Sequence, residues 1–182
     1  VSLKPRATDG AVGGVLGGVD AAGTLGLTDA ELDRITAGTL RIGSASSAAI
    51  SISQPINPAG TSTLHLITGG SVSQSAALTV ANLAVEAVGN IDLLLNNSFN
   101  RVAAQSTTSS VSLRSVTGMT IAEVDGLKQS KAASNLTFYT DNANLTIEDT
   151  SAINEIMAGE MGILVDALVA HYQAEALKRQ TS

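Results

Sequence analysis

The sequence predicts an all-β protein, a right-handed parallel β-helix in which the chain winds as a solenoid. Three observations support this. Short apolar segments that alternate with small or polar residues recur between residues 38 and 126, and alternation is the period of a β-strand. Turns rich in Gly, Ser, Thr and Asn separate these segments. Similar segments recur around Leu40, Leu64 and Leu113, which fits a coil of roughly 20 to 27 residues.

The expected strands follow one another closely. They are Leu40–Ile42, Ile50–Ile52, Leu64–Ile67, Leu78–Val80, Leu83–Val85, Ile91–Leu95, Val111–Leu113 and Met119–Ile121. We expect residues 38 to 126 to make about four coils, spaced by roughly 4.8 Å, the distance between paired strands. The coils should be right-handed because crossovers between parallel strands almost always are.

Composition favours a narrow core and excludes several classes of partner. The 182 residues suit one domain, and they include two Phe, two Tyr and no Trp. The net charge of −6 and the lack of a basic run argue against a nucleic-acid partner. Without cysteine, neither disulfides nor thiolate metal sites can stabilise the fold.

The first 26 residues are predicted to be a flexible lead-in, because seven of them are glycine and offer no side chain to bury. The segment Gly13–Gly18 matches neither the P-loop nor the dinucleotide-binding pattern, so we do not predict a phosphate site there. We expect no secretion signal within residues 1–9, because they lack a long apolar core, so that in an exported protein this chain would be an internal piece.

A short helix over residues 29–37 is predicted next. Thr28 and Glu31 form the S/T-x-x-E capping box, and Gly38 can supply a left-handed stop. Leu32 should dock the helix on the first coil. The acids of this segment are better explained by a capped, solvated first turn than by a functional carboxylate cluster; they are Asp29, Glu31 and Asp33.

Four segments of the chain carry a resemblance to a known family: Gly26–Gly43, Gly60–Gly70, Leu78–Val85 and Val124–Leu127. Together they resemble the repeat region of filamentous-haemagglutinin-like proteins, which are very large surface or secreted proteins of Gram-negative bacteria. The resemblance covers about residues 26–127. It implies a right-handed parallel β-helix, a location outside the cell or on its outer surface, and roles in adhesion, contact or extracellular matrix. It carries over no catalytic residue.

Residues 128–150 are predicted to add one more coil, with strands around Leu136–Phe138 and Leu145–Ile147. This places the β-helix at residues 27–150. Asp141–Asn144 is interpreted as a turn, because it lacks the ligand spacing of an EF-hand calcium loop.

The apolar period changes to about 3.6 after Ser151, so residues 151–182 are predicted to contain an amphipathic helix. Its stripe is Ile153, Ile156, Met157, Met161, Leu164, Leu168 and Tyr172. We expect this helix to cap the last coil or to mediate self-association. Glu155, Glu160 and Asp166 argue against a transmembrane span.

The sequence does not support a catalytic, cofactor-binding or metal-binding site. Glu86 and Asp92 are the acids of the central coils, and the other charged residues there, Arg41, Arg101 and Arg114, are expected to point outward. His65 is expected to be exposed on a strand, and no second ligand links it to His171. The asparagines at 90, 96, 97 and 100 are expected to make turns or stacked amide ladders.

The function predicted from these features is that of a structural or adhesive segment of an extracellular β-helical protein, without catalysis. Its partner would be a host-cell or glycan surface. The alternative is a small β-helix that binds or cleaves polysaccharide. Cleavage needs paired acids, or an acid and a base, converging on one face with aromatic sugar platforms.

Overall fold

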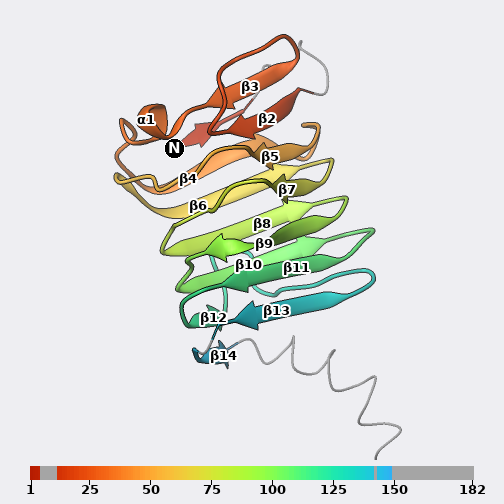
Figure 1. The fold of residues 1–182 in the computed structure, drawn as a ribbon. Helices are drawn as coiled ribbons and strands as arrows, with labels where there is room; N and C mark the ends of the chain where they lie inside the picture. The colour runs from red at the N-terminus through yellow and green to blue at the C-terminus, as the bar shows by residue number, and fades with distance from the viewer. Residues whose placement is uncertain (5–11, 142, 149–182) are drawn as a thin grey trace, which may run out of the picture. The chain divides into compact units, whose positions relative to one another are not determined.

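The structure is a computed structural model that describes residues 1–4, 12–141 and 143–148. Its strands form two sheets, A and B, whose neighbouring strands run parallel (Figure 1). Sheet A consists of β1 (Ser2–Leu3), β4 (Ala37–Ser44), β6 (Thr61–Thr68), β8 (Asn82–Ala87), β10 (Arg101–Ser106), β12 (Met119–Ile121) and β14 (Leu145–Ile147). Sheet B consists of β3 (Thr24–Leu27), β2 (Gly13–Leu16), β5 (Ile50–Ile52), β7 (Val72–Gln74), β9 (Ile91–Asn97), β11 (Val111–Ser115) and β13 (Leu136–Thr140).

From β4 to β14, successive strands alternate between the two sheets, so each pair of strands completes one coil of a solenoid. The predicted parallel β-helix is therefore confirmed. Leu40 of β4 pairs with Leu64 of β6 in parallel register, as the 24-residue repeat requires. The expected extra coil after residue 127 is also present, as β13 and β14.

The predicted repeat was only partly correct. Leu64 is followed in its column of sheet A by Leu83, Val102 and Ile121, so the central coils contain 19 residues each. The segment around Leu113, which resembles the one around Leu64, lies in sheet B instead. The same alternating pattern suits both sheets, because both have one face in the core, so the pattern by itself does not assign a strand to a sheet.

The core is a set of aliphatic ladders between the sheets. Leu40, Leu64, Leu83 and Val102 are fully buried in the ladder of sheet A, and Phe99 is the largest buried side chain among the described residues. The outer faces carry short polar residues; in sheet B, for example, Ser51 pairs with Ser73. The composition is thus explained by a narrow interior that aliphatic side chains fill.

The helix α1 (Asp29–Leu32) is shorter than the predicted 29–37. The N–H of Ala37 donates to the carbonyl oxygen of Gly60 (3.0 Å), and Ala37 already pairs with Thr61 in sheet A. Gly38 consequently lies within β4 and does not end the helix. Pairing with the next coil satisfies backbone groups and buries side chains, which a further exposed helical turn cannot do.

The predicted capping box of Thr28 and Glu31 is present. The N–H of Thr28 donates to the carboxylate of Glu31 (2.9 Å), as predicted, and the Thr28 hydroxyl donates to the same carboxylate (2.7 Å). These bonds lower the pKa of Glu31, with the bond from the Thr28 hydroxyl as the largest cause. Asp29 and Asp33 do more than face solvent, since they accept the backbone N–H groups of Asn57 (2.7 Å) and Ala59 (2.8 Å). Both acids therefore connect α1 to the next coil.

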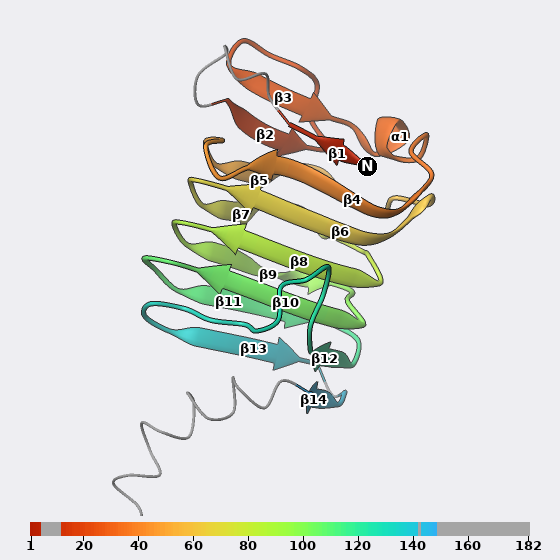
Figure 2. The same cartoon turned by 180° about the vertical axis from the view of Figure 1, so that it is seen from behind.

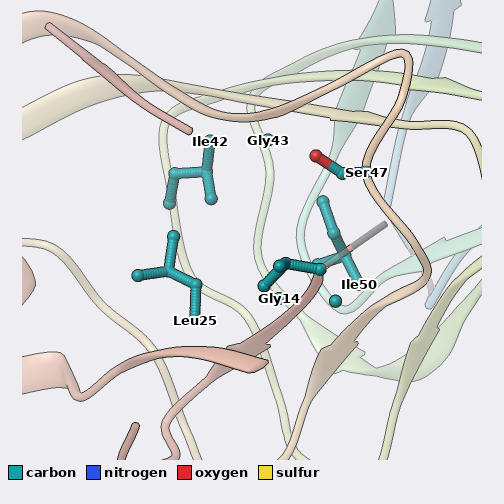
Figure 3. A pocket seen from close by; sticks show the side chains of 8 residues that line it. Gly14, Leu25, Ile42, Gly43, Ser47 and Ile50 are labelled. Carbon is teal, nitrogen blue, oxygen red and sulfur yellow. The ribbon is translucent and has the colours of Figure 1, made fainter. Parts of the chain in front are cut away.

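The β-helix begins before residue 27, where the sequence analysis placed its start. β2 and β3 pair with each other, and β2 pairs with β5. The glycines permit close packing: a Cβ on Gly26 would lie 2.1 Å from the carbonyl carbon of Val19. A small apolar cavity of about 10 Å³ lies between residues of this first coil and of the next (Figure 3). Its lining residues are Val12, Gly13, Gly14, Leu25, Ile42, Gly43, Ser47 and Ile50.

The predicted helix of residues 151–182 lies outside the described residues and stays a prediction. Within the described part of the chain, no helix has the length and apolar character needed to cross a membrane.

Candidate functional site: a charged cluster beneath a strap

Beyond the end of β12, the chain leaves β10 and then pairs with it again at Lys131. Seven additional residues form the excursion between these two points. The N–H of Ala122 donates to the carbonyl oxygen of Val102 (3.1 Å), and the N–H of Lys131 donates to that of Ala104 (2.9 Å). Val102 and Ala104 are two positions apart, so one residue would connect Ala122 to Lys131 in an uninterrupted strand. Ser130 can fill that position, and we call the additional residues, 123–129, the strap.

The strap crosses the outer face of sheet A. In Figure 2 the segment between β12 and β13 rises over β10 towards β8 and then returns. Its tip is a tight hairpin in which Val124 and Leu127 exchange backbone hydrogen bonds of 3.2 and 3.0 Å. Asp125 (φ 51°) and Gly126 (φ 84°) occupy the turn. Asp-Gly is a preferred pair for such turns because both residues tolerate positive φ, and this signal was present in the sequence.

Two alanines make room for the strap. Ala84 of β8 and Ala103 of β10 are neighbours on the outer face of sheet A, and both are fully buried beneath Val124 and Leu127. Outward-facing alanine would otherwise be exposed to solvent in a strand. The apolar contact places the hairpin tip so that Asp125 points towards β4 and β6.

The carboxylate of Asp125 is held by two residues of the sheet. Arg41 Nε lies 2.7 Å from Asp125 Oδ2, and Arg41 Nη2 lies 2.6 Å from Oδ1, so the guanidinium binds in a bidentate manner. His65 Nδ1 lies 2.7 Å from Asp125 Oδ2. Arg41 and His65 are cross-strand neighbours on β4 and β6. The cluster thus joins residues that are 84 and 60 positions apart in the sequence.

His65 points outward from β6, as predicted, but it is buried rather than exposed. Only 4% of the residue is accessible, because the strap covers it. Its Nε2 atom lies 3.0 Å from Glu86 Oε1, yet the two groups are not aligned as a hydrogen bond. A single sequence gives no sign that a distant loop covers a strand residue.

Burial and hydrogen bonding act on the pKa of Asp125 in opposite directions. Burial raises this pKa, while the hydrogen bonds and charges of Arg41 and His65 lower it, and together they hold it below its usual value. The carboxylate therefore remains ionised at neutral pH, where it can keep the strap attached.

The two remaining arginines of the coils also hold acids of the last coil. Arg101 Nη2 lies 2.8 Å from Glu148 Oε2. Arg114 binds Asp141 through Nε (3.0 Å) and Nη2, and these hydrogen bonds lower the pKa of Asp141 and raise that of Arg114. The arginines face outward as predicted, and in addition they connect coils.

Two further residues that the sequence singles out are Asp92 and His171. Asp92 is exposed on β9, and His171 lies outside the described residues.

Asn97 is a buried polar residue at the end of β9. Its side-chain amide exchanges two hydrogen bonds with that of Gln74 in the preceding coil, both of 2.9 Å. Its oxygen also accepts the N–H of Leu78 (2.9 Å). An amide pair between coils is thus present at this position. Asn96 accepts a hydrogen bond from Arg114.

The described residues contain no group of three or more His, Cys, Asp or Glu side chains that could hold a metal ion. Comparisons of the chain with protein-family models, with curated proteins and with solved structures found no match. The charged cluster must therefore be interpreted from its own geometry. That geometry fastens a loop to a sheet.

Proposed function

We propose that the chain is a structural or adhesive segment of an extracellular, filamentous-haemagglutinin-like β-helical protein. The observation that carries the proposal is the architecture: coils stack in parallel register around a core that consists mainly of aliphatic ladders. Such a solenoid can be lengthened coil by coil and presents long, flat faces, which suits a rod or a contact surface.

The use of charge supports a structural role. Arg41, Arg101 and Arg114 each bind a carboxylate that lies further along the chain. Asp125 binds Arg41 and His65. The partners that the structure gives to His65 are the carboxylates of Asp125 and Glu86, and they include no hydroxyl or thiol group. A nucleophile–base pair needs such a contact. These charges fasten coils and strap.

The test is to measure binding and turnover together. Purified protein is applied to a panel of surface polysaccharides and to host-cell surfaces, and the chain length of each polysaccharide is followed over time. We expect binding without shortening. Release of shorter products would instead support the polysaccharide-cleaving alternative.

A second test is the reading frame that encodes the chain. Further coils and a secretion domain in that reading frame would support the parent protein proposed here.

One observation favours polysaccharide binding as a second candidate. Tyr139 is 53% exposed on β13 and pairs in register with Arg114 on β11. Asp141 and Asn96 both contact Arg114. An exposed aromatic ring beside planar polar groups is suited to a sugar, which offers an apolar face and hydroxyls. Tyr139→Ala should then abolish glycan binding, while Val88→Ala, at another exposed apolar residue, should leave it unchanged.

A further inference from the structure

The hairpin tip of the strap is a self-contained unit. Its two backbone hydrogen bonds join Val124 to Leu127. The contacts that attach it to sheet A come from side chains: Val124 and Leu127 pack on the sheet, and Asp125 binds two of its residues. Because side chains attach the hairpin, it can bind sheet A without backbone pairing to any strand of the sheet.

The surface that receives the hairpin is built entirely by other elements. Ala84 and Ala103 form its apolar floor, on β8 and β10. Arg41 and His65, on β4 and β6, direct hydrogen-bonding groups at one carboxylate position. The four strands pair with one another in sheet A through backbone contacts in which the strap takes no part. The surface is therefore a preformed site for an Asp-Gly hairpin with apolar flanks.

We propose that this site is an interface between two copies of the chain, in which the strap of each copy docks on sheet A of the other. The strap seated in its own chain shows which partner fits the site. The ends of the strap meet residues that are hydrogen-bonded to β10, Ala122 and Lys131, so the strap can leave without unpairing that strand. The exchange is reciprocal and closes a two-fold dimer. It goes beyond the proposed function by naming a lateral contact between β-helices.

The first test removes the strap and supplies the hairpin separately. Deleting residues 123–129 joins Ala122 to Ser130, and we expect the variant to unfold cooperatively because Lys131 keeps its bond to Ala104. A backbone-cyclised peptide that contains residues 123–128 should then bind it at one site, measured by calorimetry. The same peptide with Asp125→Asn should bind about tenfold or more weakly, because a charged hydrogen-bond pair is lost. Absence of binding, or equal binding by both peptides, would overturn the proposal.

The second test does not depend on the deletion. Asp125→Ala damages the strap but keeps the site, and Arg41→Gln damages the site but keeps the strap. When the two full-length variants are refolded together, an intact pair can form only between copies. We expect sedimentation to show a dimer in the mixture that neither variant forms alone, and none with the double variant Arg41→Gln/Asp125→Ala. A mixture that stays monomeric at high protein concentration would contradict exchange of the strap.

Discussion

Asp125 is the residue on which the attachment of the strap depends. Its side chain is 10% exposed and accepts three hydrogen bonds from Arg41 and His65. Positive φ at this residue costs little for Asp and would cost more for a β-branched residue. The residue therefore serves both the turn and the ionic contact, which makes it the most informative position for mutation.

The stabilisation by Asp125 should depend on pH in a defined direction. Its folded-state pKa is lowered, so its contribution is fully present above the unfolded value, about 3.9, and is lost as pH falls through the folded value. We expect Asp125→Asn to lower the free energy of unfolding by about 1–3 kcal/mol at neutral pH. The difference from the wild type should shrink as the pH falls below about 3.9, which denaturant titration at a series of pH values measures.

Glu86→Gln is the matched control. The Glu86 side chain is 45% exposed, and its contact with His65 Nε2 lacks hydrogen-bond alignment. We expect a loss below about 0.5 kcal/mol, as for exposed ion pairs. Equal losses from Asp125→Asn and Glu86→Gln would show that net charge, rather than the bidentate contact, holds the strap.

At the scale of elements, α1 is held by its own capping residues and by the coil that follows it. Asp33 accepts the N–H of Ala59, which the sequence pattern did not reveal. Asp33→Ala should lower the free energy of unfolding by about 1 kcal/mol. Asp33→Asn should cost much less, because an amide oxygen can still accept this bond. Thermal melts of both variants test this, and equal losses would mean that the charge matters more than the acceptor.

The first coil offers a second test of element structure. A Cβ on Gly14 would lie 3.2 Å from Cγ1 of Ile50, which borders the cavity in Figure 3 and has space to shift. Gly14→Ala should change the free energy of unfolding by less than about 1 kcal/mol, and the lower chain entropy of the unfolded state favours stabilisation. In Gly26→Ala the Cβ would meet the backbone of Val19 at 2.1 Å, so we expect a marked loss of stability. If residues 1–26 were only a flexible lead-in, neither substitution would have an effect.

At the scale of the whole molecule, a solenoid is stabilised by contacts between neighbouring coils. The strands β6, β8 and β10 each have a partner on both sides, whereas β13 and β14 each pair with one described strand. Leu145 and Ile147 of β14 are also exposed. Within the part of the chain that the structure describes, the last coil therefore has a neighbouring coil on one side, where a central coil has one on each side.

Amide hydrogen exchange should reflect this gradient. We expect the slowest exchange in β6, β8 and β10 and clearly faster exchange in β14, because local opening is easiest where few contacts oppose it. Peptide-level mass spectrometry of the full chain measures it. Uniform protection from β4 to β14 would indicate that the coils open as a single cooperative unit.

The sequence predicted more of the fold than of the charged cluster. Alternation identified most strands, and the Leu40–Leu64 spacing gave a correct register. The capping residues located α1 but overestimated its length, since pairing between coils decided where β4 begins. Arg41 and His65 were recognised as outward-facing residues, yet their partner Asp125 was not, because it lies 84 and 60 residues away.

The sequence by itself determined the class of this protein: short alternating segments with few large side chains can bury their apolar faces only in a narrow, layered β-structure. Only the tertiary structure decided which strand lies in which sheet, how the glycine-rich start joins sheet B, and that the strap covers His65. The physical reason is range. Alternation and capping act between residues a few positions apart, whereas pairing between coils and the contacts of Asp125 depend on winding that brings distant residues together.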